Sequence, residues 1–324
     1  MPLRSTHRRL AAVLAPVLAW ACAEHMTPNA RGPGPVVAQP RSPAPAPLQV
    51  VPASNVEASP PIASWPPKNP TPTSSDFCTE SVRALDAGTC YFLPEQPTDV
   101  LLVYLHGIVP PGASSPQKTT YQAIVASACG RAGVAALLPR GRKGLAPDGL
   151  ADWWGWPTST STYKRFAPEL VQQIVDSQRA FERATGVAFR RVYLAGSSSG
   201  AYFVATLAQK GDLRVDGYGA MSGGTPILAP RLASLTPRPV YIGYGLYDTV
   251  GKSARELGQL FGRANWPVRV AEHRVGHGAK EIYLDEAFGF WNEHVRADAA
   301  RLGEGAGGTV SQIPAGLPGA AELQ

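Results

Sequence analysis

The chain has 324 residues, of which 44% are hydrophobic and 17% are charged, a length and composition that favour one large core over two full domains. Its formal net charge is +6, yet the basic residues are scattered and form no long run. No alternation of aromatic and basic residues indicates a groove for stacked bases. The composition therefore argues against a nucleic-acid partner.

The N-terminus has the layout of a secretory signal peptide over residues 1–21. A basic start that ends at Arg9 precedes an apolar run from Leu10 to Ala21, which is too short to span a bilayer as a stable helix. Small residues at the end of this run predict cleavage before Cys22. Residues 18–22 also resemble a bacterial lipobox, so membrane tethering through a lipidated Cys22 stays open beside ordinary export. We expect an exported protein that is periplasmic, extracellular or anchored as a lipoprotein.

Residues 22–75 are rich in proline, alanine and serine and predict a disordered, semi-rigid tether. Residues 302–324 are rich in glycine and alanine, and we expect a disordered tail. The tail contains the spacing G-x-G-x-x-G, but no strand pattern precedes it, so no dinucleotide site is predicted. The folded domain is expected over residues 76–301.

Between these ends, short apolar runs alternate with segments of helical spacing. The predicted strands are Val100–His106, Val134–Leu138, Arg191–Ala195, Tyr218–Met221, Pro239–Tyr244 and Val268–Val275. The predicted helices are Tyr121–Ala132, Pro168–Thr185 with Pro168 at its first position, Gly200–Gly211, Lys252–Ala264 and Lys280–Arg296. This order predicts an α/β fold with a doubly wound, mostly parallel sheet in a single domain.

A G-x-S-x-G motif, Gly196-Ser197-Ser198-Ser199-Gly200, connects a predicted strand to a predicted helix. A nucleophilic serine needs the tip of such a sharp turn, where small flanking residues let the chain segments approach closely. Ser198 is the central residue and the predicted nucleophile. Ser199 is predicted to offer its backbone N–H to an oxyanion, at the start of the helix.

A serine hydroxyl requires a base, and the base requires an acid that fixes its tautomer. His277 lies in the loop after the last predicted strand and is the predicted base, whereas the rival His273 falls inside that strand. Asp248 follows the strand that ends at Tyr244 and is the predicted acid, with a turn-forming role as the alternative. The chain order Ser, Asp, His is the order expected of an α/β-hydrolase.

The oxyanion hole needs a second donor. The strand Val100–His106 ends in His106-Gly107-Ile108, and the Ile108 N–H is the candidate. We expect His106 itself to be structural.

From about Asp76 to Arg301 the chain resembles the α/β-hydrolase superfamily, and within it the secreted esterases grouped with poly(3-hydroxybutyrate) depolymerases and feruloyl esterases. The matching pieces are 105–107, 196–200, 245–250 and 276–278. The resemblance implies an α/β-hydrolase fold and hydrolysis of carboxylic esters, small or polymeric, through an acyl-enzyme without a cofactor. Ala201 departs from the depolymerases, which commonly have another glycine at that position.

Two other functions remain open at this point: a serine peptidase of the same fold, and a non-catalytic tethered binding module. The tryptophans Trp153, Trp154 and Trp156 lie in a loop at the edge where such sheets bind ligands. They are predicted to contact an apolar or ring-bearing acyl group, or alternatively to cap the core.

Besides Cys22, the chain has three cysteines. Cys78 and Cys90 are close in sequence and are predicted to form a disulfide in an oxidising compartment, although spacing alone does not fix the pairing. Cys129 is then expected to be a small buried apolar residue. No metal site is expected, because His273 and His277 fall on a strand and a loop rather than on one helix face.

Overall fold

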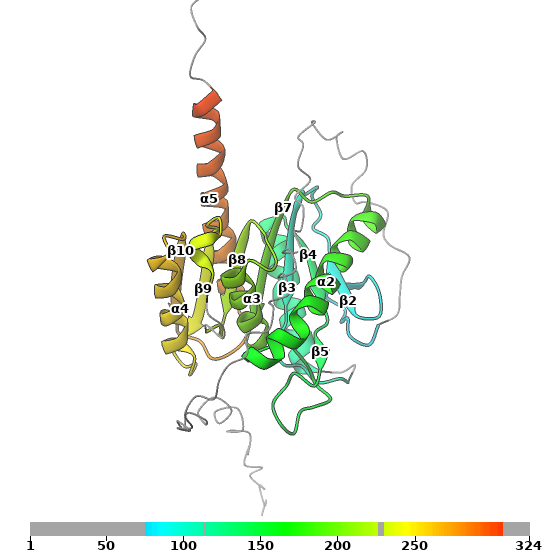
Figure 1. Cartoon of the computed structure of the whole chain (residues 1–324). Coiled ribbons are helices and arrows are strands. Elements are labelled where there is room, and N and C mark those ends of the chain that lie inside the picture. The colour runs from blue at the N-terminus through cyan, green and yellow to red at the C-terminus, as the bar shows by residue number, and fades with distance from the viewer. Residues whose placement is uncertain (1–74, 113–114, 226–229, 307–324) are drawn as a thin grey trace, which may run out of the picture.

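The computed structural model describes residues 75–112, 115–225 and 230–306, and its centre is an eight-stranded sheet (Figure 1). Along the sheet the strands are β1 (Arg83–Ala84), β2 (Thr89–Phe92), β4 (Ala135–Pro139), β3 (Val100–Leu105), β7 (Arg191–Ser197), β8 (Gly217–Met221), β9 (Val240–Gly245) and β10 (Val268–His273). The pairs from β4 to β10 are parallel, whereas β1 and β2 pair antiparallel at one edge. A separate hairpin pairs β5 (Arg142–Lys143) with β6 (Trp154–Gly155).

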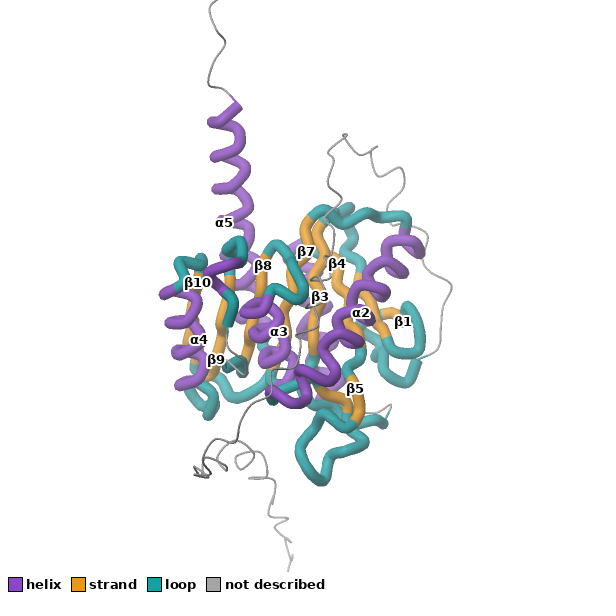
Figure 2. Tube along the Cα trace, in the orientation of Figure 1, coloured by secondary structure: helices purple, strands orange, loops and turns teal. Residues whose placement is uncertain are grey.

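Helices cover both faces of the sheet. The helices are α1 (Pro116–Ala132), α2 (Thr160–Thr185), α3 (Ser199–Lys210), α4 (Gly251–Arg263) and α5 (Glu281–Ala306), with a short 3-10 helix at Leu232–Ser234. Figure 2 shows α2 and α3 crossing in front of the strands. Successive side chains of a strand point to opposite faces, so Leu101, Val103 and Leu105 of β3 pack in the core under α2, α3 and α4. Leu102 and Tyr104 pack in the core under α1 and α5.

The predicted fold class is confirmed: the chain has a mostly parallel, doubly wound sheet of the α/β-hydrolase type. Each strand and helix expected from the sequence is present. Strands β3, β4 and β7 in the middle of the sheet are buried on both faces, which is why they read as short continuous apolar runs.

The predicted start of α2 at Pro168 is wrong. The helix begins at Thr160, where Ser159 accepts from the Thr162 N–H and the Thr162 hydroxyl bonds back to the Ser159 N–H. Pro168 therefore lies inside the helix, where it costs one backbone hydrogen bond. The serine and threonine cap satisfies the free N–H groups of the first turn, and this sets the start upstream of the proline.

Several other predicted limits also shift. Helix α1 begins at Pro116 with Ser115 as its N-cap, ahead of the expected start at Tyr121. Helix α5 continues to Ala306, past the expected domain limit at residue 301. The predicted signal peptide, Cys22, all of the tether except Ser75, and residues 307–324 lie outside the described residues.

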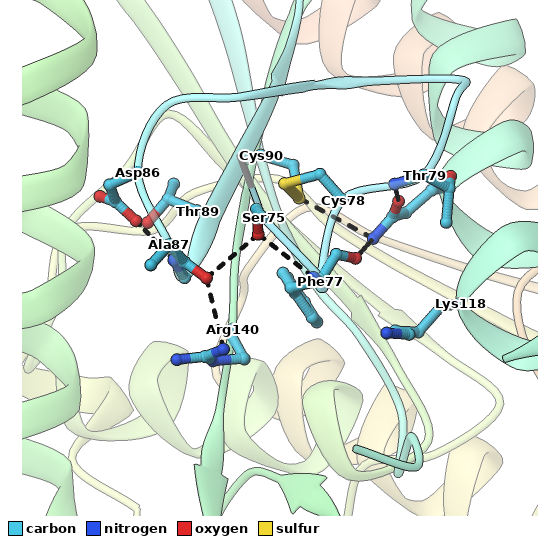
Figure 3. The surroundings of a disulfide bond; sticks show 12 residues. Ser75, Phe77, Cys78, Thr79, Asp86, Ala87, Thr89, Cys90, Lys118 and Arg140 are labelled. Carbon is cyan, nitrogen blue, oxygen red and sulfur yellow. Dashed lines mark hydrogen bonds between the residues drawn. A yellow bond between two sulfur atoms is a disulfide. The ribbon is translucent and has the colours of Figure 1, made fainter. Parts of the chain in front are cut away.

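The predicted disulfide between Cys78 and Cys90 is present, and it ties the segment before β1 to strand β2 (Figure 3). Gln122 of α1 holds the same segment, because its amide donates to the Phe77 carbonyl at 2.9 Å and accepts from the Thr79 N–H at 2.7 Å. The first described residues are thus fastened to both the sheet and α1.

Lys118 and Cys129, both on α1, are buried. The Lys118 ammonium donates to the Asp76 carbonyl at 2.7 Å, a further tie on the first described segment. Burial raises the pKa of the Cys129 thiol, so this cysteine is an inert member of the core, as expected from the sequence.

The disulfide closes a loop with a sequence separation of 12, and we expect its loss to lower the free energy of unfolding by about 3 kcal/mol, because the unfolded chain gains freedom. Urea unfolding of the wild type and of the Cys78→Ala/Cys90→Ala double variant, each with and without reductant, measures this effect. Reductant is expected to destabilise the wild type and to leave the double variant unchanged. An equal stability of oxidised and fully reduced wild type would contradict the prediction.

Candidate active site

Ser198 lies on the sharp turn between β7 and α3. Its backbone has φ 52° and ψ −121°, in a region that non-glycine residues rarely adopt. The Ser198 N–H donates to the Met221 carbonyl at the end of β8, at 3.0 Å. Such strain persists where the surrounding structure enforces it, and it is typical of functional sites.

The two glycines of the motif let this turn pack against the end of β3. A Cβ atom on Gly200 would lie 2.2 Å from the Leu105 carbonyl oxygen, and one on Gly196 would lie 2.8 Å from that same oxygen. Real Cβ contacts are not this short. The turn therefore requires glycine at both positions, for the close approach that the sequence motif predicts.

The structure brings the three predicted triad side chains together. His277 Nε2 lies 3.0 Å from Ser198 Oγ, although the two residues are 79 positions apart. His277 Nδ1 lies 2.9 Å from Asp248 Oδ2. Asp248 follows β9 and His277 lies between β10 and α5, so three strand ends supply the group. With Asp248 accepting from Nδ1–H, Nε2 is free to accept the serine proton.

The Asp248 carboxylate is hidden, whereas His277 is open to solvent. The Asp248 side chain is 1% exposed and the His277 side chain 45%. Burial by itself raises the pKa of Asp248, but hydrogen bonds and charge from His277, the Val250 N–H and the Ser222 hydroxyl outweigh it and lower the pKa overall. Asp248 is therefore ionised at neutral pH.

The two predicted oxyanion-hole donors, Ile108 and Ser199, belong to segments that lie beside Ser198. Ser199 is the first residue of α3, and Ile108 follows Gly107 in the loop after β3. A Cβ atom on Gly107 would lie 3.2 Å from Ser198 Cβ, so this loop packs directly against the serine. In the described part of the chain, neither the Ile108 nor the Ser199 N–H donates to a backbone carbonyl. Both groups remain available to a ligand.

His106 has the structural role expected from the sequence. It is buried, and its Nε2 accepts from the Gly141 N–H at 2.9 Å while Nδ1 donates to the Gly107 carbonyl. Burial above all lowers the pKa of His106 to about 4, so the ring is neutral. It fixes the loop that carries Ile108 to the segment that follows β4.

The rival histidine, His273, is occupied elsewhere. Its Nε2 lies 3.2 Å from a carboxylate oxygen of Glu286 on α5. The same carboxylate accepts from the Tyr241 hydroxyl at 2.9 Å. His273 thus belongs to a polar cluster under α5, and His277 alone of the two contacts Ser198.

The three tryptophans differ in position. Trp156 is fully buried and stacks on Phe203 with ring centroids 5.6 Å apart, so its predicted contact with substrate is wrong and it caps the core. Trp153 and Trp154 are half-buried. The Arg140 guanidinium lies over the Trp154 ring, 4.1 Å from its centroid, and covers one face of it. Trp153 is therefore the better candidate for contact with a substrate.

Sequence analysis missed one residue at this site, Ser222. It directly follows β8 and is fully buried, with φ 50°. Its position after a strand at the same edge as Ser198 is a signal in the sequence, but its backbone conformation and its partners depend on tertiary structure.

Within the described ranges, no group of three or more His, Cys, Asp and Glu side chains is placed to hold a metal ion. Over the same ranges, no helix combines the length and apolarity needed to cross a bilayer.

Comparison with known proteins gives structural likeness only. The chain matches no protein-family profile and no curated protein sequence. A solved structure of YahD with malic acid is 15% identical, with a TM-score of 0.46 over 63% of this chain and 98% of that one. Esterase PE8 is 15% identical, with a TM-score of 0.47 over 63% and 96% of the two chains.

A carboxylesterase from Bacillus cereus is 16% identical, with a TM-score of 0.47 over 66% of this chain and 99% of that chain. The assignment of the fold rests on the strand order and helix placement of this chain itself.

The Gly200→Ala variant should lose activity, because the added methyl group collides with the Leu105 carbonyl and displaces the Ser198 turn. We expect kcat/KM for a simple ester to fall by roughly 100-fold or more. Gly289→Ala is the matched control, since Gly289 is an exposed helical glycine whose Cβ would meet nothing within 4 Å. That control should keep full activity and gain about 0.5–1 kcal/mol of stability. Wild-type activity in Gly200→Ala would contradict the account of the turn.

Proposed function

We propose that the protein is a serine hydrolase that cleaves carboxylic esters through an acyl-enzyme. The observation that supports this most is the continuous contact from Asp248 through His277 to Ser198, at 2.9 and 3.0 Å. A hydroxyl in this contact loses its proton to the imidazole as it attacks a carbonyl carbon. The exposure of His277 and the partial exposure of Ser198 agree with access for a substrate.

In the first half of the reaction, Ser198 Oγ bonds to the ester carbonyl carbon and its proton passes to His277 Nε2. The carbonyl oxygen gains the negative charge and accepts from the Ile108 and Ser199 N–H groups. The tetrahedral intermediate collapses, the bond to the alcohol oxygen breaks, and His277 returns the proton to that oxygen. Asp248, buried and ionised, stabilises the transient imidazolium.

In the second half, water replaces the alcohol. His277 takes a proton from the water as its oxygen attacks the acyl carbon, and the bond to Ser198 Oγ then breaks with return of the proton to the serine. The products are a carboxylic acid and a regenerated hydroxyl. Every step uses groups of this chain and one water molecule.

Ser198→Ala should lower hydrolysis of p-nitrophenyl butyrate by roughly four to six orders of magnitude, because the members of a triad act as a unit. His277→Ala should have a similar effect, and neither variant should react with a fluorophosphonate probe. Two control variants remove a histidine and a serine that are not members of the triad. They are His273→Ala, which removes the ring that contacts Glu286, and Ser177→Ala, which removes a buried hydroxyl on α2 that bonds to Thr89.

Both controls should retain the wild-type rate. Retained activity in Ser198→Ala would place the nucleophile elsewhere. A wild type that neither hydrolyses esters nor reacts with the probe would instead favour a non-catalytic binding module, and cleavage of peptides in preference to esters would favour a peptidase.

Trp153 is proposed to contact the acyl group of the substrate, because it is the half-buried tryptophan in the loop between β5 and β6 without a cation stacked on it in the described structure. We expect Trp153→Ala to raise KM for a feruloyl ester by roughly 2- to 10-fold, the value of one aromatic contact, and to leave KM for an acetate ester unchanged. Trp153→Phe should retain most of the aromatic preference. An equal change for both esters would refute a role in acyl selection.

The finer likeness to poly(3-hydroxybutyrate) depolymerases and feruloyl esterases stays a prediction. A panel of p-nitrophenyl esters of increasing chain length, with feruloyl esters and a suspended polyester, tests it directly.

A further inference from the structure

Ser222 lies in the middle of the site, although it is not a member of the triad. It is fully buried directly after β8, and its N–H donates to the Gly243 carbonyl of β9 at 2.7 Å. Its φ of 50° puts a non-glycine residue in the left-handed region. The buried hydrogen bond from the Ser222 N–H to β9 thus stabilises a backbone conformation that is unfavourable for a residue other than glycine.

The pair Met221 and Ser222 contacts the segments that carry all three triad residues. The Met221 carbonyl accepts from the Ser198 N–H at 3.0 Å. The Ser222 hydroxyl donates to the carbonyl of Gly278, the residue after His277, at 3.1 Å. The Asp248 carboxylate is a second acceptor for the single proton of this hydroxyl, and this contact is among those that lower the pKa of Asp248.

Few contacts of its own hold the loop that carries His277, so a hydrogen bond from a rigid neighbour such as Ser222 restricts its position. Gly276 and Gly278 flank the histidine, and a Cβ atom on either would meet nothing within 4 Å. The imidazole itself is 45% exposed, so packing holds it weakly. A short, glycine-flanked loop in open surroundings has many conformations, and few of them keep Nε2 within reach of Ser198.

In the described part of the chain, two side chains donate to carbonyls of this loop. Lys280 donates to the His277 carbonyl at 3.2 Å, in an exposed bond from a long side chain. Ser222 has a short side chain on a rigid, buried strand end, so its bond loses little entropy and fixes one position. The buried contact is therefore the more restrictive of the two.

We propose that Ser222 is a positioning residue for the proposed ester hydrolysis, whose hydroxyl holds the His277 loop at the distance at which His277 accepts the Ser198 proton. The inference rests on the proposed function and assigns no proton transfer to Ser222. It explains why a strained, non-glycine residue is present at the end of β8: the Ser222 hydroxyl donates to the Gly278 carbonyl, which glycine has no side chain to do.

The test compares Ser222→Gly and Ser222→Ala with Ser177→Ala. Glycine adopts the positive φ freely and lacks the hydroxyl, so it separates the hydrogen bond from the backbone conformation. We expect kcat for p-nitrophenyl butyrate to fall by roughly 10-fold or more in both Ser222 variants with KM changed less than about 2-fold, because misplacement of a base by a fraction of an ångström slows proton transfer. The rate of fluorophosphonate labelling at Ser198 should fall in parallel. Ser177→Ala removes a buried hydroxyl far from the site along α2 and should change neither rate.

A carbon-13 NMR titration supplies a readout that a general loss of stability does not change. The Asp248 carboxyl should titrate at a higher pH in Ser222→Gly than in the wild type, because one of the groups that lower its pKa has been removed. Urea unfolding shows whether each variant is folded. If Ser222→Ala does not fold, Ser222→Gly alone tests the proposal, because glycine adopts the positive φ without strain.

Two outcomes are distinguishable from each other. A wild type that hydrolyses esters, together with a Ser222→Gly variant of normal kcat and labelling rate, overturns the role of Ser222 and leaves the proposed function intact. A wild type without ester hydrolysis or labelling overturns both.

Discussion

The close approach of the Ser198 turn to the end of β3 is the constraint on which the rest of the site depends. Gly200 and the Leu105 carbonyl oxygen lie so near each other that a Cβ atom would be 2.2 Å from that oxygen. This contact brings the first turn of α3 against the loop that carries Gly107 and Ile108. The Ser198 hydroxyl and the segments that carry Ile108 and Ser199 consequently share one small region, where the proposed mechanism places the attacked carbonyl group.

The histidine and the carboxylate depend on a different part of the fold. The parallel strands β7, β8, β9 and β10 end at one edge of the sheet, which carries Ser198, Ser222, Asp248 and the loop of His277. Asp248 is buried, and hydrogen bonds to its carboxylate outweigh the cost of that burial and keep it ionised. An exposed imidazole on a glycine-flanked loop is thereby held between a fixed anion and the serine. The buried hydroxyl of Ser222 limits the freedom of that loop.

Sequence alone predicts those parts of the molecule that depend on local pattern. The apolar runs of buried parallel strands, the G-x-S-x-G motif with a strand before it and a helix after it, and the order Ser198, Asp248, His277 are all local signals. They were sufficient for the fold class and for three side chains that the structure brings into contact. The disulfide also followed from residues close in sequence.

What the sequence does not predict depends on contacts between distant segments. The sequence does not distinguish Trp156 from Trp153 and Trp154, but stacking on Phe203 buries Trp156 in the core. The short strand β2 is held by its antiparallel pairing with β4, which no local pattern indicates. Ser222 acts through its positive φ and its bond to Gly278, both set by neighbouring strands and a loop 56 residues away.

Rapid acid quench of the wild type during turnover of p-nitrophenyl butyrate, followed by mass spectrometry of the peptides, tests the central claim most directly. The account predicts a butyryl group on Ser198, formed within the first turnover and lost as water completes the reaction. Steady hydrolysis with no acyl group on Ser198 at any time, or with the acyl group on another residue, would contradict it.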